Sequence, residues 1–359
     1  MDKECTILPI AELEGHEDRV WTVAWNPARP LLASCSADRT VRLYHYTQQP
    51  EGSASPYSFQ SNAAISTEHM KTVRSIAWSP SGQTLATASF DSNIGIWEQT
   101  SDEDMDDDGT EASGNGDWEC VTLLEGHETE CKSVAFSSDG SLLASCSRDK
   151  TVWVWEVHPD ADFECLAVLM EHSQDVKCVA WHPREEILAS ASYDDTVRLY
   201  IDDNTDGDWF CCAALTGHTS TVWSLAWSPD GRYLASASDD KTIRIWTRPS
   251  SQAHQWVCVT VLGGTHKRAI YSVSWGPGRS GSGGWLASTG SDGHIFVWEF
   301  EADTPAASPK YSFIASLSAA HGVHDVNCIS WCPRKGHERL LATCGDDGNT
   351  RIWIVQANV

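Results

Sequence analysis

The sequence predicts an all-β protein in which seven repeats each form a four-stranded sheet and the sheets close into one ring. Three observations lead to this prediction. Histidines recur every 45 to 58 residues, a bulky aromatic residue follows each histidine, and an aspartate with a second aromatic residue ends each repeat. Short alternating strands with turn residues between them, repeated at such a period, are typical of one repeat array rather than of separate domains.

The repeats align on their histidines, which are His16, His69, His127, His172, His218, His266 and His321. Nine residues after each of the first six, and ten after the seventh, stand Trp25, Trp78, Phe136, Trp181, Trp227, Trp275 and Trp331. A polar turn and an "LAS" or "LAT" strand lead to Asp38, Asp91, Asp149, Asp194, Asp240, Asp292 and Asp347. Six residues further on are Tyr44, Trp97, Trp155, Tyr200, Trp246, Trp298 and Trp353. This order predicts a seven-bladed WD40 β-propeller.

The strand "TILPIAEL", Thr6 to Leu13, precedes the first histidine and has no earlier blade to join. We expect it to complete the last blade, formed by residues from about 325 to 355, because this pairing removes an open sheet edge. The whole chain, 1-359, is then a single propeller closed by its N-terminal strand.

Five insertions break the period, at 47–56, 98–117, 248–254, 276–284 and 301–310. In a propeller with inner strands a, b and c and outer strand d, all five fall on the face that carries the a-to-b and c-to-d connections. The acidic loop at 100-117 is poor in hydrophobic residues and rich in like charge, so we expect it to be disordered. The opposite face has short, uniform turns and suits a rigid recognition surface.

Composition excludes several classes of protein. The chain has 50 acidic against 25 basic residues, a formal net charge of -25, so we expect no direct nucleic-acid ligand. It contains no run of eighteen apolar residues, and its start, "MDKECTILPI", does not resemble a secretory signal. Thirteen cysteines, an odd number scattered through apolar segments, indicate reduced thiols. We therefore expect a cytoplasmic protein, with the nucleus as a second location and no membrane partner.

Each repeat also places a hydroxyl four residues before its aspartate: Ser34, Thr87, Ser145, Ser190, Ser236, Ser288 and Thr343. Serine, histidine and aspartate together resemble a hydrolase triad. A catalytic site occurs once in a chain, whereas these residues occur in every repeat, so we interpret them as structural tetrads. Two examples are His127, Ser145, Asp149 and Trp155, and His218, Ser236, Asp240 and Trp246. The phenols of Tyr44 and Tyr200 are expected to donate where they replace tryptophan.

No enzyme motif remains once the tetrads are assigned to the scaffold. The other histidines and the cysteines do not show zinc-ligand spacing, and the chain has neither a P-loop nor a glycine-rich dinucleotide turn. We predict a protein that is not an enzyme, with no metal site and no directly bound cofactor.

Function is then expected at the positions that the scaffold leaves free on the short-turn face. Blades 1 to 4 carry cations there with aromatic residues among them, a composition typical of binding hot spots. The predicted partner-binding residues are Arg148, Lys132, Arg74, Lys177, Arg19, Trp21, Phe90, Tyr193, Trp223 and Tyr271. Arg148 is the only basic residue among the seven that precede the tetrad aspartates, and we expect it to bind an acidic group of a partner. The alternative is that these charges are merely solvated.

Stretches such as "LASCSRDKTVWVWE", "DVKCVAWHP" and "STVWSLAWSPDGRYLASASDDKTIRIW" resemble the WD40 subunit of the cytosolic iron–sulfur protein assembly (CIA) targeting complex. The resemblance covers nearly all of the chain except the insertions. It implies a docking platform that works with a small cysteine-bearing partner and a large HEAT-repeat adaptor to deliver [4Fe–4S] clusters to cytosolic and nuclear apoproteins. The insertions at 100–117 and 276–284 depart from the family, so contacts on that face do not carry over.

Two other classes remain as alternatives. A WD40 substrate receptor or adaptor of a ubiquitin ligase often has Trp-Asp-x-Arg after strand c, where this chain reads "WEQT", "WEVH", "YIDD", "WTRP", "WEFE" and "WIVQ". A scaffold of a signalling complex, similar to the G-protein β subunit, usually adds an N-terminal coiled coil, and only about five residues precede the first strand here.

Overall fold

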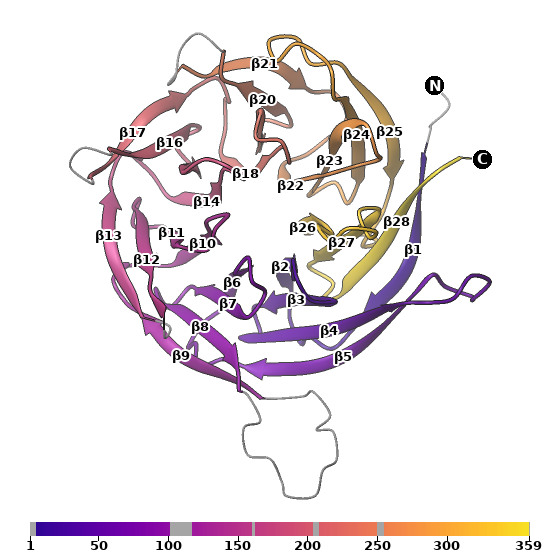
Figure 1. Cartoon of the computed structure of the whole chain (residues 1–359), viewed down its shortest axis with the longest axis horizontal. Coiled ribbons are helices and arrows are strands. Elements are labelled where there is room, and N and C mark those ends of the chain that lie inside the picture. Colours follow the sequence, from indigo (N-terminus) through magenta and orange to yellow (C-terminus); the bar gives the residue numbers. More distant parts are fainter. Residues whose placement is uncertain (1–4, 101–116, 160–161, 204–207, 250–254, 359) are drawn as a thin grey trace, which may run out of the picture.

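Seven four-stranded antiparallel sheets surround a central axis and form a closed ring (Figure 1). The computed structural model describes residues 5–100, 117–159, 162–203, 208–249 and 255–358. It confirms the predicted all-β class and the seven-bladed propeller. The acidic loop predicted to be disordered lies, except for its first and last residues, outside the described residues. Within the described ranges no helix is long and apolar enough to cross a membrane.

Each blade contributes four strands in the order a, b, c, d from the axis outward. Blade 1 has β2 (Val20–Trp25), β3 (Leu31–Ser36), β4 (Thr40–Gln48) and β5 (Tyr57–Ser66). Blade 2 has β6 (Val73–Trp78), β7 (Thr84–Ser89), β8 (Ile94–Gln99) and β9 (Trp118–Leu124). Blade 3 has β10 (Cys131–Phe136), β11 (Leu142–Ser147), β12 (Val152–Val157) and β13 (Phe163–Leu169).

The remaining blades follow the same order. Blade 4 has β14 (Val176–Trp181), β15 (Ile187–Ser192), β16 (Val197–Asp203) and β17 (Asp208–Leu215). Blade 5 has β18 (Val222–Trp227), β19 (Tyr233–Ser238), β20 (Ile243–Thr247) and β21 (Val257–Leu262). Blade 6 has β22 (Ile270–Gly276), β23 (Ser282–Gly290), β24 (Ile295–Glu301) and β25 (Tyr311–Leu317). Blade 7 has β26 (Val326–Trp331), β27 (Leu340–Gly345), β28 (Thr350–Ala357) and β1 (Cys5–Leu13).

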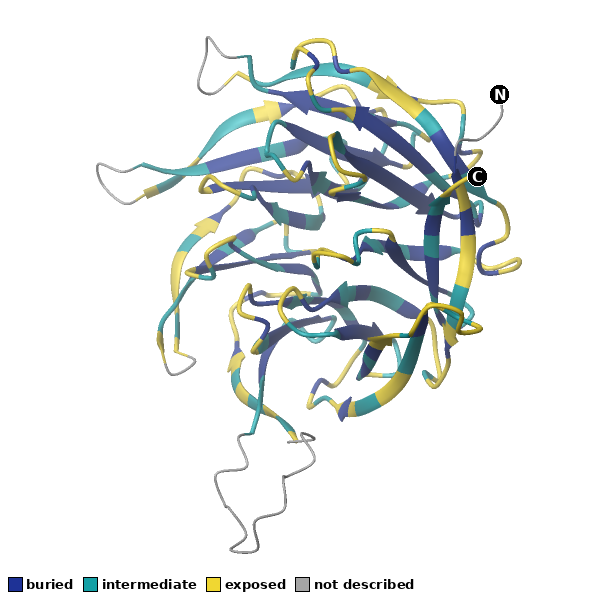
Figure 2. Cartoon of the chain, turned by 45° about the vertical axis from the view of Figure 1, so that its right-hand side comes forward, coloured by how far each residue is buried: buried dark blue, intermediate teal, exposed yellow. Residues whose placement is uncertain are grey.

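The hydrophobic core lies between neighbouring blades. Strands b such as β3 and β11, both "LLASCS", are buried along their whole length, because their small and aliphatic side chains fit between two adjacent sheets. Strands d are more exposed than strands b, as the yellow segments at the outside of the ring show (Figure 2), and β9 alternates between half-buried and exposed residues. Each apolar cluster draws residues from two consecutive blades, so every blade depends on both of its neighbours.

The N-terminal strand closes the ring as predicted. β1 pairs antiparallel with β28, from Cys5 opposite Ala357 to Leu13 opposite Thr350. The register shifts after Pro9, at the point where a residue without an N–H group is tolerated in a ladder. Cys5 and Leu13 are buried in the clusters on the two sides of blade 7. The last blade is therefore assembled from both ends of the chain, which lie side by side in Figure 1.

Tetrads join the d-to-a turn to the b-to-c turn in each blade; we call the face that carries these turns the upper face. In blade 3, His127 Nδ1 lies 2.8 Å from Asp149, His127 Nε2 lies 2.9 Å from Ser145, and the Trp155 indole donates to Ser145 over 3.1 Å. Asp149 also accepts hydrogen bonds from the backbone N–H groups of Glu128 and Thr151. One carboxylate therefore holds both turns.

The histidine-to-aspartate and histidine-to-hydroxyl contacts are present in all seven blades. The indole also donates to the hydroxyl in blades 2, 3, 5 and 7. In blade 6, Trp298 packs against Phe296 and Phe313. Imidazole and carboxylate are thus the constant part of the unit.

The expectation that tyrosine donates in place of tryptophan was wrong. Across the described chain, no hydrogen bond of standard geometry reaches the buried Tyr44 hydroxyl. The Tyr200 hydroxyl lies 3.4 Å from Ser190, and the serine is the donor. The phenol oxygen is placed differently from an indole nitrogen, so the substitution keeps the packing and weakens the polar contact.

Asp149→Ala should lower the free energy of unfolding by roughly 1–3 kcal/mol, because it leaves a buried histidine without its partner. Urea unfolding monitored by tryptophan fluorescence measures this change. Glu128→Ala is the matched control, since this neighbouring side chain is exposed and its loss should change stability by less than about 0.5 kcal/mol. An equally small effect at Asp149 would contradict the structural role of the tetrads.

Stability should also fall in acid. Burial alone would raise the pKa of Asp91 and Asp292, but hydrogen bonds from His69 and His266 outweigh it and lower both pKa values to about 2. An unfolded aspartate has a pKa of about 3.9, so the stabilisation is complete above about pH 4 and is lost as the pH falls toward 2. The urea midpoint should therefore drop between pH 5 and pH 3. A midpoint that stays constant over this range would contradict the assignment.

Candidate functional site on the upper face

A cavity of about 300 Å³ lies at the centre of the ring on the upper face. The second residue of each strand a points toward the axis there. In every a-to-b ladder the register skips this residue, as Trp21 is skipped between Val20 and Thr22 of β2. A bulge of this kind re-aims one side chain without disturbing the rest of the strand. The repeated bulge therefore builds the site.

Eight of the ten predicted partner-binding residues line this cavity: Arg19, Trp21, Arg74, Phe90, Lys132, Lys177, Trp223 and Tyr271. The structure brings them together from blades 1 to 6, although they are distant in the chain. Asp325, Asn327 and Asp346 of blade 7 complete the lining. These three are not among the predicted partner-binding residues. Asp325 and Asn327 follow His321 by one residue more than in the other blades, and Asp346 precedes the tetrad aspartate.

The cations of the cavity lie over aromatic rings. Arg74 lies 4.7 Å from the centroid of Trp21, on which Arg19 also packs at 5.6 Å. The Lys132 ammonium lies 4.0 Å from the centroid of Phe90. Such contacts stabilise a cation whose hydration shell is partly removed. They fix the positive groups around one half of the cavity.

Lys177 continues this arrangement into blades 4 and 5. Its ammonium lies 5.0 Å from the ring of Tyr193 and 5.3 Å from that of Trp223. Tyr193 lies outside the lining, on the rim, where 47% of it is exposed. Tyr271 packs edge-on against Trp223. Aromatic surface therefore separates the cationic half of the cavity from blade 7.

The blade 7 half of the cavity is acidic. Asp346 accepts a hydrogen bond from Asn327 over 2.9 Å and faces Arg19 at 3.7 Å. Asn327 also donates to the backbone oxygen of Val20 in blade 1. The cavity thus has two poles, and a ligand with an anionic group is directed toward blades 1 to 4.

Arg74 is the least compensated cation of the site. Burial lowers the pKa of its guanidinium, and the groups that oppose this effect are the thiols of Cys35, Cys328, Cys344 and Cys178. Among the residues that the structure describes, no carboxylate forms an ion pair with Arg74. A partly desolvated guanidinium without a counter-ion favours an incoming carboxylate, which it can bind bidentately.

Arg148 stands apart from the cavity. It lies on the rim with 59% of its side chain exposed, and its guanidinium is 3.6 Å from Glu130. Glu130 also accepts a hydrogen bond from Lys132. Burial alone would raise the pKa of Glu130, but Lys132 and Arg148 lower it. Glu130 therefore neutralises part of the positive charge of Lys132 and Arg148.

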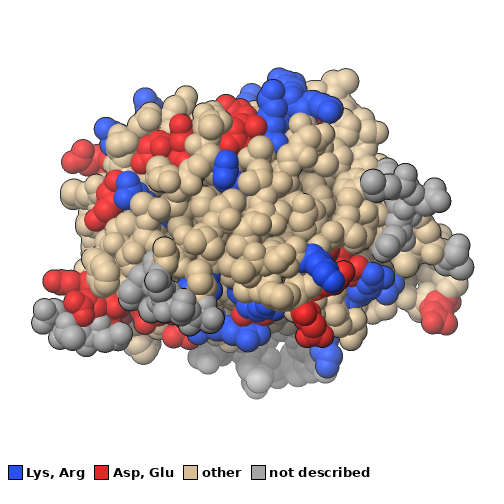
Figure 3. Space-filling view, turned by 90° about the horizontal axis from the view of Figure 1, so that it is seen from above, with Lys and Arg blue, Asp and Glu red and all other residues tan. Residues whose placement is uncertain are grey.

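Charged groups gather near the two faces, and the wall between them is largely uncharged where Figure 3 views the ring edge-on. The outer strands in blades 3 to 5 expose Leu166, Val168, Phe210 and Val261. Among the described residues, these four side chains are apolar, in contrast to the cations that line the central cavity.

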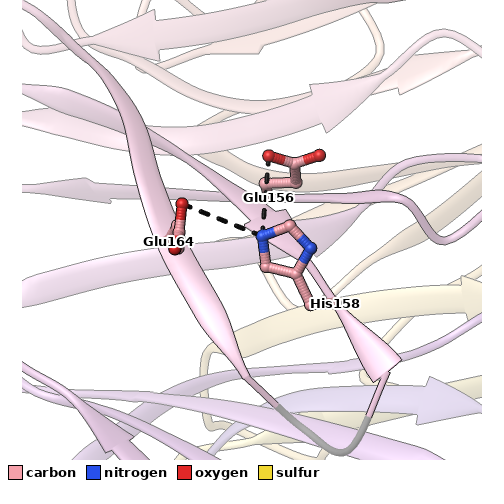
Figure 4. A group of neighbouring side chains, drawn as sticks. All are labelled: Glu156, His158 and Glu164. Carbon is pink, nitrogen blue, oxygen red and sulfur yellow. Dashed lines mark ion pairs between the residues drawn. The ribbon is translucent and has the colours of Figure 1, made fainter.

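One group of side chains in the described ranges has the spacing of metal ligands: Glu156, His158 and Glu164. Glu156 and Glu164 are cross-strand partners on β12 and β13, and His158 Nε2 lies 3.6 and 3.9 Å from their carboxylates (Figure 4). Two like charges directly opposite each other destabilise a sheet, and the His158 imidazole lies next to both carboxylates. All three side chains are accessible to solvent, and an ion-pair role is sufficient to explain their arrangement.

The sequence of the chain is similar to those of known proteins. A family model described as "WD domain, G-beta repeat" matches residues 8–45, 62–98, 118–156, 163–200, 209–247, 256–299 and 311–353. The "Probable cytosolic iron-sulfur protein assembly protein 1" of Mycosarcoma maydis is 48% identical over 423 residues, covering 97% of this chain and 93% of that protein.

Proteins of the same name in two other fungi are similarly close. The one from Cryptococcus neoformans (strain JEC21) is 43% identical over 431 residues, covering 96% of this chain and 98% of its own length. The one from Candida glabrata is 41% identical over 348 residues, covering 96% and 97%. The likeness therefore spans the whole ring and not only the repeated tetrads.

Proposed function

Since the chain belongs to the WD40-repeat family of the cytosolic iron-sulfur protein assembly protein 1, we propose that it is a non-enzymatic docking subunit of the cytosolic machinery that assembles iron–sulfur proteins. In this role it holds a targeting complex together while [4Fe–4S] clusters are delivered to cytosolic and nuclear apoproteins. The observation that carries the proposal is a rigid cavity of cations and aromatic rings on a protein of net charge -25.

A binding role suits the chemistry of the site better than a catalytic one. Each potential acid, base or nucleophile of the tetrads is engaged with the others in all seven blades, and a WD40 propeller is typically a binding fold. The cavity itself offers cations and aromatic rings, which recognise a surface. The cluster is cargo for the complex, and this chain contributes docking contacts.

The partners of the proposal are those implied by the family resemblance: a small cysteine-bearing protein and a large HEAT-repeat adaptor, together with the apoprotein clients. The names of the relatives place their work in the cytosol. We propose the same location for this chain, and the nucleus as a second one through its nuclear clients.

We further propose that an acidic group of a partner or client binds at the cationic half of the upper face. Arg74, Lys132 and Lys177 provide the partly buried positive groups, and Arg148 provides the exposed one at the rim. The aromatic residues around them are large and rigid, so they add contact area at little cost in conformational entropy. The aspartates of blade 7 set the orientation of the bound segment.

Arg148→Glu should weaken partner capture at least tenfold, because a hydrogen bond to a charged group is worth about 1.5–3 kcal/mol. Co-precipitation of the purified partner measures it. Lys241→Glu, the same charge change on the b-to-c turn of blade 5, is the matched control and should leave capture unchanged. Both variants should melt within a few degrees of the wild type. Full capture by Arg148→Glu would contradict the proposed contact.

The function itself is tested by depletion and rescue in cells. Removing the protein should lower the activity of a cytosolic [4Fe–4S] enzyme and spare a cytosolic enzyme that has no cluster. Wild-type chain should restore the activity, and affinity purification should recover assembly factors and apoproteins. Unchanged cluster-enzyme activity, or recovery of ubiquitin-ligase subunits in their place, would overturn the proposal.

A further inference from the structure

One pair of facing positions near the axis differs chemically in blade 7 from all other blades. The third residue of strand a lies opposite the next-to-last residue of strand b. In blades 1 to 6 these pairs are Thr22 and Cys35, Ser75 and Ala88, Ser133 and Cys146, Cys178 and Ala191, Ser224 and Ala237, and Ser272 and Thr289. In blade 7 they are Cys328 on β26 and Cys344 on β27.

The geometry of this position allows a covalent bond between the two sulfurs. Residues directly opposite each other in an antiparallel ladder have Cα atoms about 4.5 or 5.5 Å apart, and disulfides span about 4.4–6.8 Å between Cα atoms. The two thiols also act on each other, since each is a cause of the other's pKa shift, downward for Cys328 and upward for Cys344. The backbone of the propeller therefore does not have to move.

The two thiols differ in access. Cys344 is fully buried. Cys328 is partly exposed and lines a second cavity, about 650 Å³ in volume, that lies along the axis below the central cavity and is walled by Trp181, Trp227, Trp275 and Trp331. A small reagent in this space reaches Cys328 first, and Cys344 only through it.

The surroundings of Cys328 also favour its reactive form. The contact with Cys344, a hydrogen bond with the Val23 backbone and the charge of Arg74 lower the pKa of the Cys328 thiol to about 7, against the effect of burial. Burial instead raises the pKa of Cys35 to about 12 and that of Cys178 to about 11. Cys178 occupies in blade 4 the position of Cys328, so the difference arises from the neighbours.

We propose that Cys328 and Cys344 are a thiol modification site, in which Cys328 reacts with a hydroperoxide and Cys344 resolves the product to a disulfide. An accessible thiol beside a resolving thiol is the arrangement found in redox-sensitive cysteines. The proposed docking function does not require this chemistry, so the thiol site and the docking function are tested independently of each other.

The reaction balances in two steps. The Cys328 thiolate attacks one peroxide oxygen, the O–O bond breaks, and the leaving oxygen takes up protons as water, so sulfur is oxidised by two electrons to a sulfenic acid. The Cys344 thiol then loses its proton and attacks the Cys328 sulfur, the S–O bond breaks and water leaves. In total, two thiols and one hydrogen peroxide give one disulfide and two waters.

The disulfide would alter the contacts between blade 7 and blade 1, where the ring closes. The Cys328 thiol donates to the backbone oxygen of Val23 in blade 1 over 3.9 Å, and the neighbouring Asn327 donates to the backbone oxygen of Val20 in the same strand. A sulfur drawn toward β27 loosens the first contact, next to the acidic pole of the upper cavity.

The test treats the reduced full-length chain with hydrogen peroxide, blocks free thiols with iodoacetamide and identifies linked tryptic peptides by mass spectrometry. We expect a link between peptides 311–334 and 340–351. Because Cys332 shares the first peptide, fragment spectra and the variant Cys328→Ser must assign the link. Serine and alanine occupy these positions in other blades, so Cys328→Ser and Cys344→Ala are expected to fold.

The variants separate the two roles. Cys328→Ser should abolish the link, and Cys344→Ala should leave Cys328 as a sulfenic acid that dimedone traps. Cys146→Ala and Cys178→Ser are the matched controls and should form the link in wild-type yield. Separate alkylation of Cys328 and Cys344 after peroxide would overturn the proposal. It would also be overturned by failure of dimedone to label Cys344→Ala, or by a link that persists in Cys328→Ser.

Discussion

The hydrogen bond between a histidine and an aspartate, repeated in every blade, is the interaction on which the upper face depends. It joins two turns that are separated by a strand pair, and the same carboxylate also accepts backbone N–H groups from both turns, as Asp149 does. Because these polar groups are buried from competing water, the contact is geometrically demanding. Because these turns are held in place, the start of strand a is held in place too. The direction of its bulged second residue is set in this way.

A constant scaffold frees other positions to vary. The second residue of strand a is Trp21, Arg74, Lys132, Lys177, Trp223, Tyr271 or Asn327, on one backbone geometry in seven blades. Symmetry of the ring and asymmetry of the cavity therefore come from different residues. The cations cluster in consecutive blades, and their charges reinforce one another at a site where the chain as a whole is acidic.

The periodic features were predictable from the sequence because they repeat. Seven copies of one spacing identified the tetrads, the blade boundaries and the closing strand Thr6 to Leu13, and counting from each histidine located most of the cavity lining. Features that depend on a single position were harder to derive. Nothing in the letters of Tyr44 shows that its hydroxyl has no hydrogen bond of standard geometry within the described chain. The exposure of Arg148 follows from a turn that carries it outside the cavity.

The other features that could not be predicted from the sequence depend on contacts between blades. Arg74 looks like any rim cation in sequence. Only the structure shows that no carboxylate among the described residues pairs with it and that thiols from blades 1, 4 and 7 act on its guanidinium. The pairing of Cys328 with Cys344 similarly depends on a bulge that shifts the ladder by one residue. A one-residue shift changes which side chains face each other, and hydrophobic periodicity does not report it.

The central claim is that a partner docks on the upper face through the cations around Arg74. A structure of the chain bound to its assembly partner tests this claim most directly. We expect an acidic side chain or terminus of the partner within hydrogen-bonding distance of the Arg74 guanidinium, with Trp21 and Trp223 buried at the interface. A partner bound only to the outer wall or the lower face, with the upper cavity left open, would contradict the account.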